Sequence, residues 1–472
     1  MPRFDLCVVG SGPGGQKAAI QAAKLGKRVC VVEQGHMLGG SAVHTGTIPS
    51  KAMREMVLRI GGIRSVAPLV QDFAQAASKI GLRDLRGPYE EVVREEAEIV
   101  REHFESNDVR LVTGRARFRD AHTVDVVTGD ESYPVEADFF VIAVGSTPAC
   151  PASVPFDGRN VFTTDDLLQL GGMPHSMIIV GGGVIGTEYA SMLAVMGVRV
   201  TLIEGRSRLL EFADAEIVEA LQYHLRQNGV TLRLGEKVAS IERVDSTAPG
   251  RNPEARPVEA VLESGKRVRA DCLLYCIGRQ GATADLGLAA LGIEPDARGR
   301  IEVDSAYRTS VPHVYAVGDV IGFPALASTS MEQGRLAACH MFEAACDSTI
   351  GLLPYGIYSI PEISMVGATE EQLTEQGIPY EGGIAHYREI ARGKLLHDEI
   401  GMLKLLIHTG SHALLGVHAI GTGATELVHI GQAVMALGGK VEYFVDSVFN
   451  YPTLAECYKV AALNGLNRMR NV

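Results

Sequence analysis

Two stretches of the sequence, one at the N-terminus and one starting near residue 176, follow the same pattern. Each consists of a strand-like apolar run, a glycine turn, a helix and a second strand that ends in an acid. The segments are 4–9, 10–15, 16–25 and 28–33 in the first copy, and 177–180, 181–186, 187–196 and 198–204 in the second. The acid lies 23 positions after the first glycine in both copies, from Gly10 to Glu33 and from Gly181 to Glu204. This order of segments predicts parallel βαβ units, and hence an α/β fold.

Both glycine turns have the spacing of a dinucleotide-binding site. The first glycine permits the tight turn, the second lets backbone approach a pyrophosphate, and the third lets the helix pack on the strand. The helix N-terminus then faces the negative charge, and the acid accepts hydrogen bonds from a ribose diol. The predicted binding residues are Gly10, Gly12, Pro13, Gly14, Gly15 and Glu33 in the first copy, and Gly181, Gly183, Val184, Ile185, Gly186 and Glu204 in the second. A lone glycine turn is also typical of an ordinary loop, but here both copies have the strand, helix and acid that the motif requires.

Length, charge and cysteine spacing limit the class of protein. A chain of 472 residues is too long for one hydrophobic core and predicts about three domains. A net charge of -12, with acids and bases interspersed, gives no basic surface for nucleic acid or membranes. No secretion signal is visible, no apolar run approaches the roughly 20 residues that span a bilayer, and the eight cysteines form neither a CxxC pair nor a metal-ligand spacing. We expect a soluble, cytoplasmic protein with free, reduced thiols and no metal site.

The remaining segments add further strands and helices. They are a helical stretch at 51–107, hairpin-like strands at 111–135, and strand-and-turn segments at 139–148, 274–279 and 313–319. The segment from Asp245 to Pro257 is rich in Pro, Gly, Asn and Ser and predicts a surface hairpin loop. From about Tyr355 onward strands alternate with helices, which predicts a separate α+β domain.

Several separated motifs resemble the pyridine nucleotide-disulfide oxidoreductase superfamily over essentially the whole chain. They are the two glycine units, Ile48-Pro49-Ser50-Lys51 at the start of the first long helix, the turn from Ala143 to Pro148, and the turn at Gly318 and Asp319. The resemblance implies two Rossmann-like three-layer nucleotide-binding domains and a C-terminal α+β dimerisation domain. It divides the chain into an FAD-binding domain in two parts, 1–150 and 273–350, an NAD(P)-binding domain, 151–272, and a dimerisation domain, 351–472. A homodimer, with room for higher assembly, is expected.

The resemblance also implies the cofactors and their contacts. The first glycine unit binds FAD and the second binds a nicotinamide nucleotide, NAD or NADP. Glu33 holds the FAD adenosine ribose and Asp319 the ribityl chain, while Lys51 and Glu188 form an ion pair near flavin N5. A buried cation there has a physical role, because it stabilises the negative charge that hydride transfer brings to the flavin. Further cofactor contacts are implied for Gln34, Ser41, Ala42, Thr47, Arg115, Ala116, Ala143, Gly145, Ser146, Gly278, Arg279, Gly318, Leu326 and Ala327.

The sequence departs from the disulfide reductases at the positions that carry their thiol chemistry. Those enzymes have two cysteines before the Ile-Pro-Ser-Lys segment, where this chain has Ala42 and Thr47. They also use a C-terminal histidine as acid and base for the thiols, oriented by a glutamate. This chain has Tyr451 at the histidine position and retains Glu456. The dithiol relay is therefore missing as a unit. Tyr451 either contacts the flavin of the neighbouring subunit or has a packing role alone.

The flavin site, the nucleotide site and the Lys51–Glu188 pair remain, which is enough for hydride to pass through one flavin. Four segments are most similar to the soluble NAD(P) transhydrogenase family. They are the segments around Lys51, Asp319 and Tyr451, and the C-terminal run Val-Ala-Ala-Leu-Asn-Gly-Leu-Asn. This similarity implies hydride transfer between NADPH/NADP and NAD/NADH without a redox-active disulfide. An NADH-preferring diaphorase, quinone reductase or oxidase is the alternative, and a noncatalytic nucleotide-binding protein is the third class. Glu204 favours NAD, whereas a 2'-phosphate requires positive charge, which Arg206 and Arg208 supply unless they are ordinary surface residues.

Overall fold

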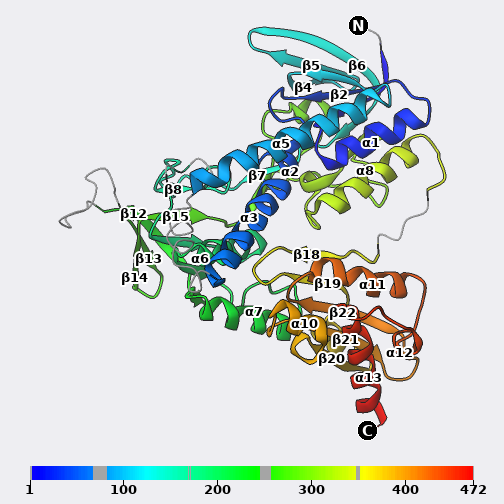
Figure 1. Ribbon diagram of the computed structural model, residues 1–472. Coiled ribbons are helices and arrows are strands. Elements are labelled where there is room, and N and C mark those ends of the chain that lie inside the picture. The colour runs from blue at the N-terminus through cyan, green and yellow to red at the C-terminus, as the bar shows by residue number, and fades with distance from the viewer. Residues whose placement is uncertain are drawn as a thin grey trace.

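The computed structural model describes residues 3–66, 82–167, 170, 172–244, 257–346 and 351–470. Three large sheets organise the chain (Figure 1). The first glycine unit belongs to one sheet, the second unit to another, and the segment from Tyr355 onward forms the third. The protein is a mixed α/β protein with two dinucleotide-type units, as the repeated pattern predicts.

The first sheet is parallel at its centre and carries the first glycine unit. Its strands are β1 (Phe4–Val9), β2 (Val29–Glu33), β3 (Arg110–Thr113), β4 (Arg115–Asp120), β5 (Thr123–Thr128), β6 (Glu131–Ile142) and β17 (Val314–Ala316). The order is β3-β2-β1-β6-β5-β4, and β17 also pairs with β6. The apolar run of β1 is buried on both faces, as a central parallel strand requires. Helices α1 (Pro13–Lys24) and α8 (Ala327–Met341) pack side by side on this sheet (Figure 1).

The second sheet repeats this arrangement around the second glycine unit. Its parallel strands follow the order β11-β10-β9-β15-β8, with bounds β8 (Val161–Phe162), β9 (Ser176–Val180), β10 (Arg199–Glu204), β11 (Thr231–Leu234) and β15 (Cys272–Tyr275). Helix α6 (Val184–Val195) follows the glycine turn, and α7 (Ala215–Gln227) precedes β11. A small antiparallel sheet, β12 (Val238–Arg243), β13 (Val258–Leu262) and β14 (Arg267–Ala270), completes this part.

The third sheet is antiparallel, in agreement with the predicted α+β pattern. Its order is β18-β19-β22-β21-β20, with bounds β18 (Tyr355–Ile357), β19 (Ile363–Gly367), β20 (Tyr380–His386), β21 (Met402–His408) and β22 (Leu414–Ile420). The helices here are α9 (Glu370–Glu375), α10 (Ala391–Leu396), α11 (Ala424–Ala436), α12 (Glu442–Asp446) and α13 (Glu456–Arg470). Helix α7 of the second unit contacts β22, so the second and third sheets are packed together.

The connecting helices differ in detail from the sequence prediction. The helical stretch predicted at 51–107 consists of α3 (Thr47–Val66) and α5 (Leu82–Glu105), and residues 67–81 between them lie outside the described part. A short helix, α2 (Gly40–His44), precedes α3. Met53 and Val57 of α3 belong to the hydrophobic core of α6 and the second sheet. Helix α3 therefore bridges the two glycine units. The predicted surface loop at 245–257 lies outside the described residues apart from Pro257.

The hairpin and turn segments are built around one long strand. The sequence suggests separate strands near 135 and 139, but β6 runs without a break from Glu131 to Ile142. Its first half pairs with β5 in antiparallel fashion and its second half with β1 in parallel. Beyond it, the two-stranded sheet of β7 (Ser146–Pro148) and β16 (Arg279–Gly281) joins the two predicted strand-and-turn segments.

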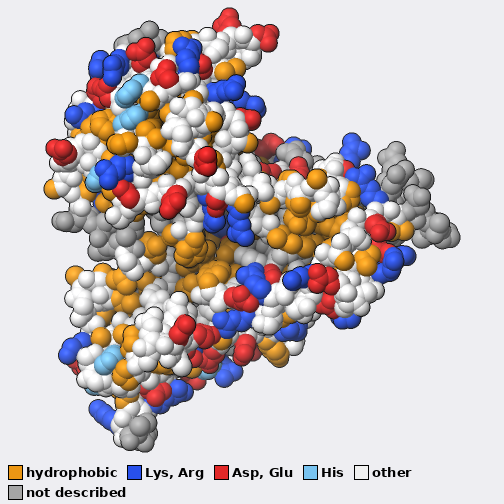
Figure 2. All heavy atoms as spheres, turned by 180° about the vertical axis from the view of Figure 1, so that it is seen from behind, with side chains coloured by type: hydrophobic (Ala, Val, Ile, Leu, Met, Phe, Trp, Pro, Cys, Tyr) orange, Lys and Arg blue, Asp and Glu red, His pale blue; other side chains and the backbone are white. Residues whose placement is uncertain are grey.

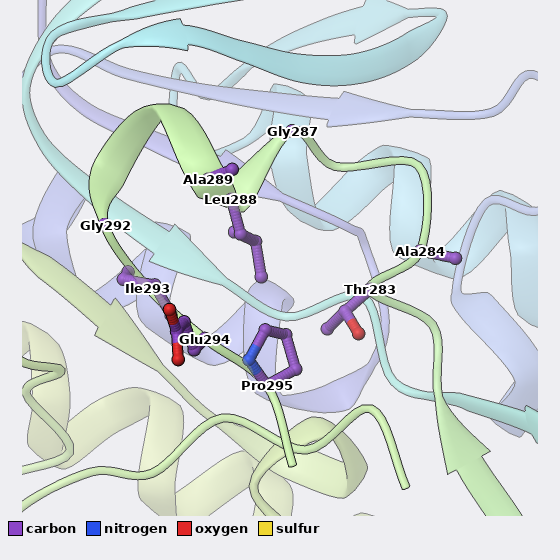
Figure 3. A pocket seen from close by; sticks show the side chains of 9 residues that line it. All are labelled: Thr283, Ala284, Gly287, Leu288, Ala289, Gly292, Ile293, Glu294 and Pro295. Carbon is purple, nitrogen blue, oxygen red and sulfur yellow. The ribbon is translucent and has the colours of Figure 1, made fainter. Parts of the chain in front are cut away.

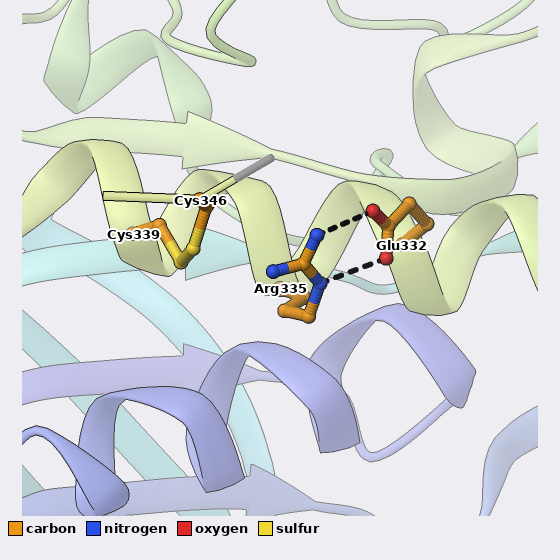
Figure 4. Close-up of a disulfide and its surroundings, with 4 residues drawn as sticks. All are labelled: Glu332, Arg335, Cys339 and Cys346. Carbon is orange, nitrogen blue, oxygen red and sulfur yellow. Dashed lines mark hydrogen bonds and ion pairs between the residues drawn. A yellow bond between two sulfur atoms is a disulfide. The ribbon is translucent and has the colours of Figure 1, made fainter. Parts of the chain in front are cut away.

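The prediction that all thiols are free is wrong for two cysteines. Cys339 and Cys346 form a disulfide at the end of α8, with 6.2 Å between their Cα atoms (Figure 4). The chain reverses direction after the helix, and the amide of Ala344 donates to the carbonyl oxygen of Cys339. This turn brings Cys346 back beside the helix, which a spacing of seven residues does not reveal. The other six cysteines are free thiols.

We expect a thiol count that depends on reduction. The protein denatured without reductant should expose six reactive thiols per chain, because six of the eight cysteines are unpaired. Prior reduction should raise the count to eight. The measurement is a colorimetric thiol titration in denaturant, with the Cys339→Ser/Cys346→Ser double variant as control, for which both conditions should give six. Eight thiols in the unreduced protein would contradict the disulfide.

Candidate functional site: two dinucleotide turns joined by an ion pair

In the first glycine turn, other backbone segments approach the glycines so closely that a side chain would not fit at two of them. Gly10 has a φ of +100°, and a Cβ there would collide with the carbonyl group of Ala143. A Cβ on Gly15 would collide with the carbonyl oxygen of Gly10. Gly12 is the N-cap of α1, Pro13 starts the helix, and no side chain caps this N-terminus. No described side chain caps the amide groups of this first helical turn, which leaves them available to bind a pyrophosphate.

The second glycine turn has the same geometry. Gly181 has a φ of +109°, and a Cβ there would lie 2.7 Å from the carbonyl oxygen of Cys276. A Cβ on Gly186 would collide with the carbonyl oxygen of Gly181, while Gly183 is the uncapped N-cap of α6, which begins Val184-Ile185. The two predicted turns are therefore equivalent in backbone conformation as well as in sequence.

Glu33 closes the first turn at the end of β2. Its Oε2 accepts hydrogen bonds from the amide and the hydroxyl of Ser11, both at 2.7 Å, and its Oε1 accepts from the amide of Gln34 at 2.6 Å. Burial raises the pKa of Glu33, and the hydrogen bonds from Ser11 and Gln34 offset this only in part. The carboxylate is held in place beside the turn, with acceptor capacity left for a ribose hydroxyl.

The neighbouring predicted contacts gather around the first turn. The amide of Gly114 donates to the carbonyl oxygen of Glu33 at 2.9 Å, which brings Arg115 and Ala116 at the start of β4 beside the acid. A Cβ on Gly40 would lie 2.9 Å from the Cα atom of Gly12, so α2 starts against the turn. Three more predicted residues follow Gly40 in the chain. Ser41 and Ala42 lie on α2, and Thr47 is the first residue of α3.

A polar cluster joins three further turns that the sequence singled out separately. The hydroxyl of Ser146 donates to Oδ2 of Asp319 at 2.7 Å and accepts from Nε of Arg279 at 2.8 Å. Arg279 also donates to the carbonyl oxygen of Ser146 and lies 4.0 Å from Asp319. Each of these three residues follows a glycine with a positive φ angle, which turns the backbone there. The glycines are Gly145, Gly278 and Gly318. The remaining predicted contacts, Leu326 and Ala327, are the N-cap and first residue of α8.

Lys51 and Glu188 form the predicted ion pair. Nζ of Lys51 lies 3.0 Å from Oε1 and 2.9 Å from Oε2 of Glu188, and it also donates to the hydroxyl of Ser50. The Glu188 side chain is 5% exposed and that of Lys51 is 26% exposed, so the carboxylate is buried while the ammonium remains accessible. Lys51 belongs to α3 and Glu188 to α6. The pair therefore connects α3 with α6, the helix that follows the second glycine turn.

A third part of the chain completes this pair, and sequence reasoning missed it. The amide of Tyr358 donates to Oε1 of Glu188 at 2.8 Å, and its ring lies 4.8 Å from Nζ of Lys51. Arg54, one turn after Lys51, is buried and donates to the carbonyl oxygen of Ser359 and to Glu362. Only the spacing of Arg54 three residues after Lys51 hints at this in the sequence. A cation over an aromatic ring is stabilised there, and the ring contact restricts where the Lys51 ammonium lies.

Glu204 lies beside the second turn, and its carboxylate oxygens already accept hydrogen bonds from the protein. Its Oε2 accepts from the amide of Gly182 at 2.6 Å and from Nη2 of Arg206 at 2.9 Å, and its Oε1 accepts from the amide and Nε of Arg206. Burial raises the pKa of Glu204, but the hydrogen bonds and charge of Arg206 and the amide of Gly182 outweigh it, so this pKa lies below its ordinary value. Arg208 points elsewhere and pairs with Glu371 on α9. Of the two predicted cations, only Arg206 contacts the acid.

Tyr451 and Glu456 lie in the C-terminal part. Within the described residues of one chain, Tyr451 makes no hydrogen bond or ring contact with the Lys51–Glu188 pair, and its residue is 69% exposed. Oε2 of Glu456 is buried and has no hydrogen-bond partner among the described residues. The predicted contact of Tyr451 with a flavin of a neighbouring subunit is not tested by a single chain and stays a prediction.

One face of the molecule has a hollow. Figure 2 shows a hollow lined with apolar side chains between the part of the molecule that contains the first sheet and the part that contains the third. A separate cavity of about 620 Å³ lies at the segment from Thr283 to Pro295, beside the 3-10 turn Leu288–Leu291 (Figure 3). None of the predicted site residues lines it. No cluster of three or more potential metal ligands occurs among the described residues, and no described helix is long and apolar enough to cross a membrane.

Two equivalent dinucleotide turns, each with an acid that accepts a hydrogen bond from the turn, and a lysine–glutamate pair between α3 and α6 define an oxidoreductase with two nucleotide sites. The family model for pyridine nucleotide-disulphide oxidoreductases matches residues 4–334, and the model for the dimerisation domain of these enzymes matches residues 353–462. The chain belongs to this family, whose members use FAD and a pyridine nucleotide.

Curated relatives are similar over the full length. A soluble pyridine nucleotide transhydrogenase from Mycobacterium bovis is 51% identical over 472 residues, which cover 100% of this chain and 98% of the relative. One from Hahella chejuensis is 45% identical and covers 99% of both chains. Among solved structures, the HOCl-induced flavoprotein disulfide reductase RclA from Escherichia coli has a TM-score of 0.85 at 25% identity, covering 98% of this chain and 99% of that one. LpdA from Mycobacterium tuberculosis, with a TM-score of 0.87, 24% identity and coverage of 97% and 99%, has the same fold.

Proposed function

We propose that the protein transfers hydride between NADPH/NADP and NAD/NADH through FAD, without a redox-active disulfide. The observation that carries the proposal is the Lys51–Glu188 pair, which joins α3 to α6, the helix that follows the second dinucleotide turn. FAD supplies a hydride acceptor and donor when bound. The full-length similarity to proteins named soluble pyridine nucleotide transhydrogenase supports the same reaction.

Each part of the site has a role in this proposal. The uncapped N-terminus of α1, the first turn and Glu33 hold the FAD pyrophosphate and adenosine ribose. The cluster of Ser146, Arg279 and Asp319 offers hydroxyl, guanidinium and carboxylate groups to the ribityl chain. The second turn and Glu204 hold the nicotinamide nucleotide. A Cβ on Gly12 would meet only the carbonyl oxygen of Ala143, at 3.9 Å, so the open backbone at Gly12 fits the close approach of a bound pyrophosphate.

Lys51 supplies the positive charge at the reacting end. Its ammonium is fixed by two hydrogen bonds to Glu188 and by the ring of Tyr358, so it needs little rearrangement when negative charge develops nearby. Glu188 is anchored in turn by the amide of Tyr358. The pair is thus pre-organised to stabilise charge, and it transfers no proton to a thiol.

The absence of a dithiol relay is part of the proposal. Ala42 and Thr47 occupy the positions of the two thiols, and Tyr451 occupies that of their histidine base. The disulfide that the structure contains joins Cys339 on α8 to Cys346 beyond the end of that helix and is not part of this segment. Direct transfer from nucleotide to flavin and back needs neither group. Tyr451 is proposed to contact the flavin of a neighbouring subunit, with Glu456 nearby.

We further propose a cytoplasmic homodimer with the domain division 1–150, 151–272, 273–350 and 351–472. The C-terminal part contains a dimerisation domain and carries large apolar residues that are exposed in a single chain. They include Leu437, Val448 and Tyr451, which are 87%, 95% and 69% exposed. Such side chains in one region are typical of a surface that another subunit covers. Pairing of β17 with β6 supports the return of segment 273–350 to the first domain.

Anaerobic titration of the purified protein tests the proposed function. NADPH and NADH should each bleach the yellow absorbance of the bound flavin, and addition of NAD to the NADPH-reduced protein should restore it with formation of NADH. The nucleotides are separated and quantified by chromatography. If NADPH leaves the flavin oxidised while NADH and a quinone turn over, the protein is an NADH-preferring quinone reductase. If neither nucleotide bleaches the flavin, the protein is not a hydride-transferring enzyme.

A further inference from the structure

The carboxylate at the end of β10 has no free acceptor capacity. Glu204 accepts four hydrogen bonds, one from the amide of Gly182 and three from Arg206, and a carboxylate offers about four lone-pair positions. A ribose 2'-hydroxyl can bond to Glu204 only if a donor leaves. Backbone amides are fixed by the turn, so the group that can move is the guanidinium of Arg206, whose side chain is 41% exposed. Occupation of the ribose position and displacement of this guanidinium are therefore coupled.

A second cation lies beside the same turn and comes from a different part of the chain. The segment 235–237 runs along the end of β10, because the amide of Gly235 donates to the carbonyl oxygen of Arg206 and the amide of Glu236 to that of Glu204. The side chain of Lys237 crosses over Gly205, with its Cγ, Cδ and Cε atoms 3.1 to 3.8 Å from where a Cβ of that glycine would be. The absence of a side chain at Gly205 is what lets the Lys237 side chain cross over the residue that follows Glu204.

None of the described acids near Lys237 forms an ion pair with its ammonium group. Glu236, the adjacent acid, is bonded to Lys266 at 2.6 Å and to the hydroxyl of Ser264. Among the described residues, the only hydrogen bond between Glu263 and Lys237 runs from the amide of Glu263 to the carbonyl oxygen of Lys237. Within the part of the chain that the structure describes, no carboxylate pairs with the Lys237 ammonium. An exposed, unpaired cation next to an acid that is already neutralised leaves the turn with excess positive charge at its rim.

We propose that Arg206 and Lys237 together form the binding site for the 2'-phosphate of NADP, with the Arg206 guanidinium alternating between Glu204 and the phosphate. This proposal rests on the proposed function and explains how one site accepts both nucleotides. With NAD, the ribose 2'-hydroxyl replaces part of the Arg206 contact on Glu204. With NADP, the guanidinium and the Lys237 ammonium bind the phosphate and offset its repulsion by Glu204.

The charges explain why two cations are needed. A 2'-phosphate carries up to two negative charges and would lie beside the buried carboxylate of Glu204. One arginine that stays bound to that acid leaves the phosphate without a counter-ion. Lys237 adds a charge that does not depend on Glu204, so the guanidinium can move without leaving an unbalanced negative cluster. Sequence spacing cannot reveal Lys237, which lies 33 residues after Glu204 in the chain, from 204 to 237.

Binding of two adenosine fragments to the FAD-containing protein tests the proposal without requiring turnover. The probes are 2',5'-ADP and 5'-AMP, which differ only in the 2'-phosphate, and Kd is measured by calorimetry. Arg206→Gln should weaken 2',5'-ADP about 10-fold or more, and Lys237→Gln about 3-fold. Binding of 5'-AMP should stay unchanged with Lys237→Gln and be unchanged or tighter with Arg206→Gln, because Glu204 gains free acceptors. The preference for 2',5'-ADP should shrink as salt rises.

Two matched variants remove cations that are paired elsewhere. Arg119→Gln takes away the partner of Asp125, and Arg208→Gln takes away the partner of Glu371. Both should leave the ratio of the two Kd values within about twofold. The proposal is overturned if Arg206→Gln and Lys237→Gln weaken both fragments equally, or if neither changes the ratio. If 2',5'-ADP binds as expected but NADPH does not bleach the flavin, the proposed function fails while the phosphate site stands.

Discussion

The Lys51→Met variant should reduce its flavin with NADPH or NADH about 100-fold more slowly than the wild-type protein. The ammonium of Lys51 is the fixed positive charge at the junction of the two dinucleotide units, and it is held by both oxygens of Glu188. Methionine has a similar length but no charge, so the variant keeps the packing of α3 and loses the electrostatic stabilisation. The rate is measured by anaerobic stopped-flow absorbance of the flavin.

A companion variant separates charge from positioning. In Glu188→Gln the lysine keeps its charge but loses its carboxylate anchor, so we expect a smaller loss, about 10-fold. The losses in the double variant should not add, because the two residues act as one unit. Lys266→Met, which removes a surface cation paired with Glu236, should reduce at the wild-type rate. Wild-type rates in a Lys51→Met protein with full flavin content would show that the pair has only a structural role.

The Lys404→Met variant should lower the free energy of unfolding by about 3 to 5 kcal/mol. Lys404 on β21 is 1% exposed, and its Nζ lies 3.0 Å from Asp214 and from Glu216 and 2.9 Å from Glu370. Asp214 is itself buried and caps α7. Removal of the lysine leaves three carboxylates facing one another where the second and third sheets meet. Equilibrium urea unfolding followed by circular dichroism measures the change.

The pH dependence of this cluster has a definite sign. Burial lowers the pKa of Lys404, but the charge of Asp214 and the hydrogen bonds that the ammonium donates to the three acids outweigh it, so the pKa is raised above its ordinary value. The stabilisation is therefore fully present below the unfolded-state pKa of about 10.4 and is lost only as pH rises beyond it. Asp214→Asn in the Lys404→Met background should recover part of the loss. An equal loss for Lys266→Met, whose ion pair is partly exposed, would argue against burial as the cause.

Local patterns predicted local structure closely. Strand β1 has the bounds that the sequence suggests, and β2 and α1 differ by a few residues at their starts, because strand, turn and helix of one unit are specified within about 30 residues. The same short-range pattern located Glu33 and Glu204 at the ends of their strands. The equivalence of the two turns followed from glycine positions alone, since only glycine fits where carbonyl groups approach so closely.

Contacts between distant segments could not be predicted in this way. Tyr358 lies 170 residues after Glu188 and reaches it only through the packing of the third sheet, and no motif marks it. Lys237 reaches Gly205 through a turn after β11, and Cys346 returns to Cys339 through a reversal after α8. The pairing of Lys51 with Glu188 was found only by resemblance to a known family, since nothing in the spacing of two single residues relates them.

The hydrogen bond from the amide of Tyr358 to Glu188 makes the order of synthesis relevant to activity. A growing chain emerges from the ribosome N-terminus first, so Lys51 and Glu188 are both made long before residue 358. Until then the acid lacks its anchor and the lysine lacks the ring that restrains it. The pair therefore reaches its final geometry only after the last quarter of the polypeptide has been made and the third sheet has packed against α6.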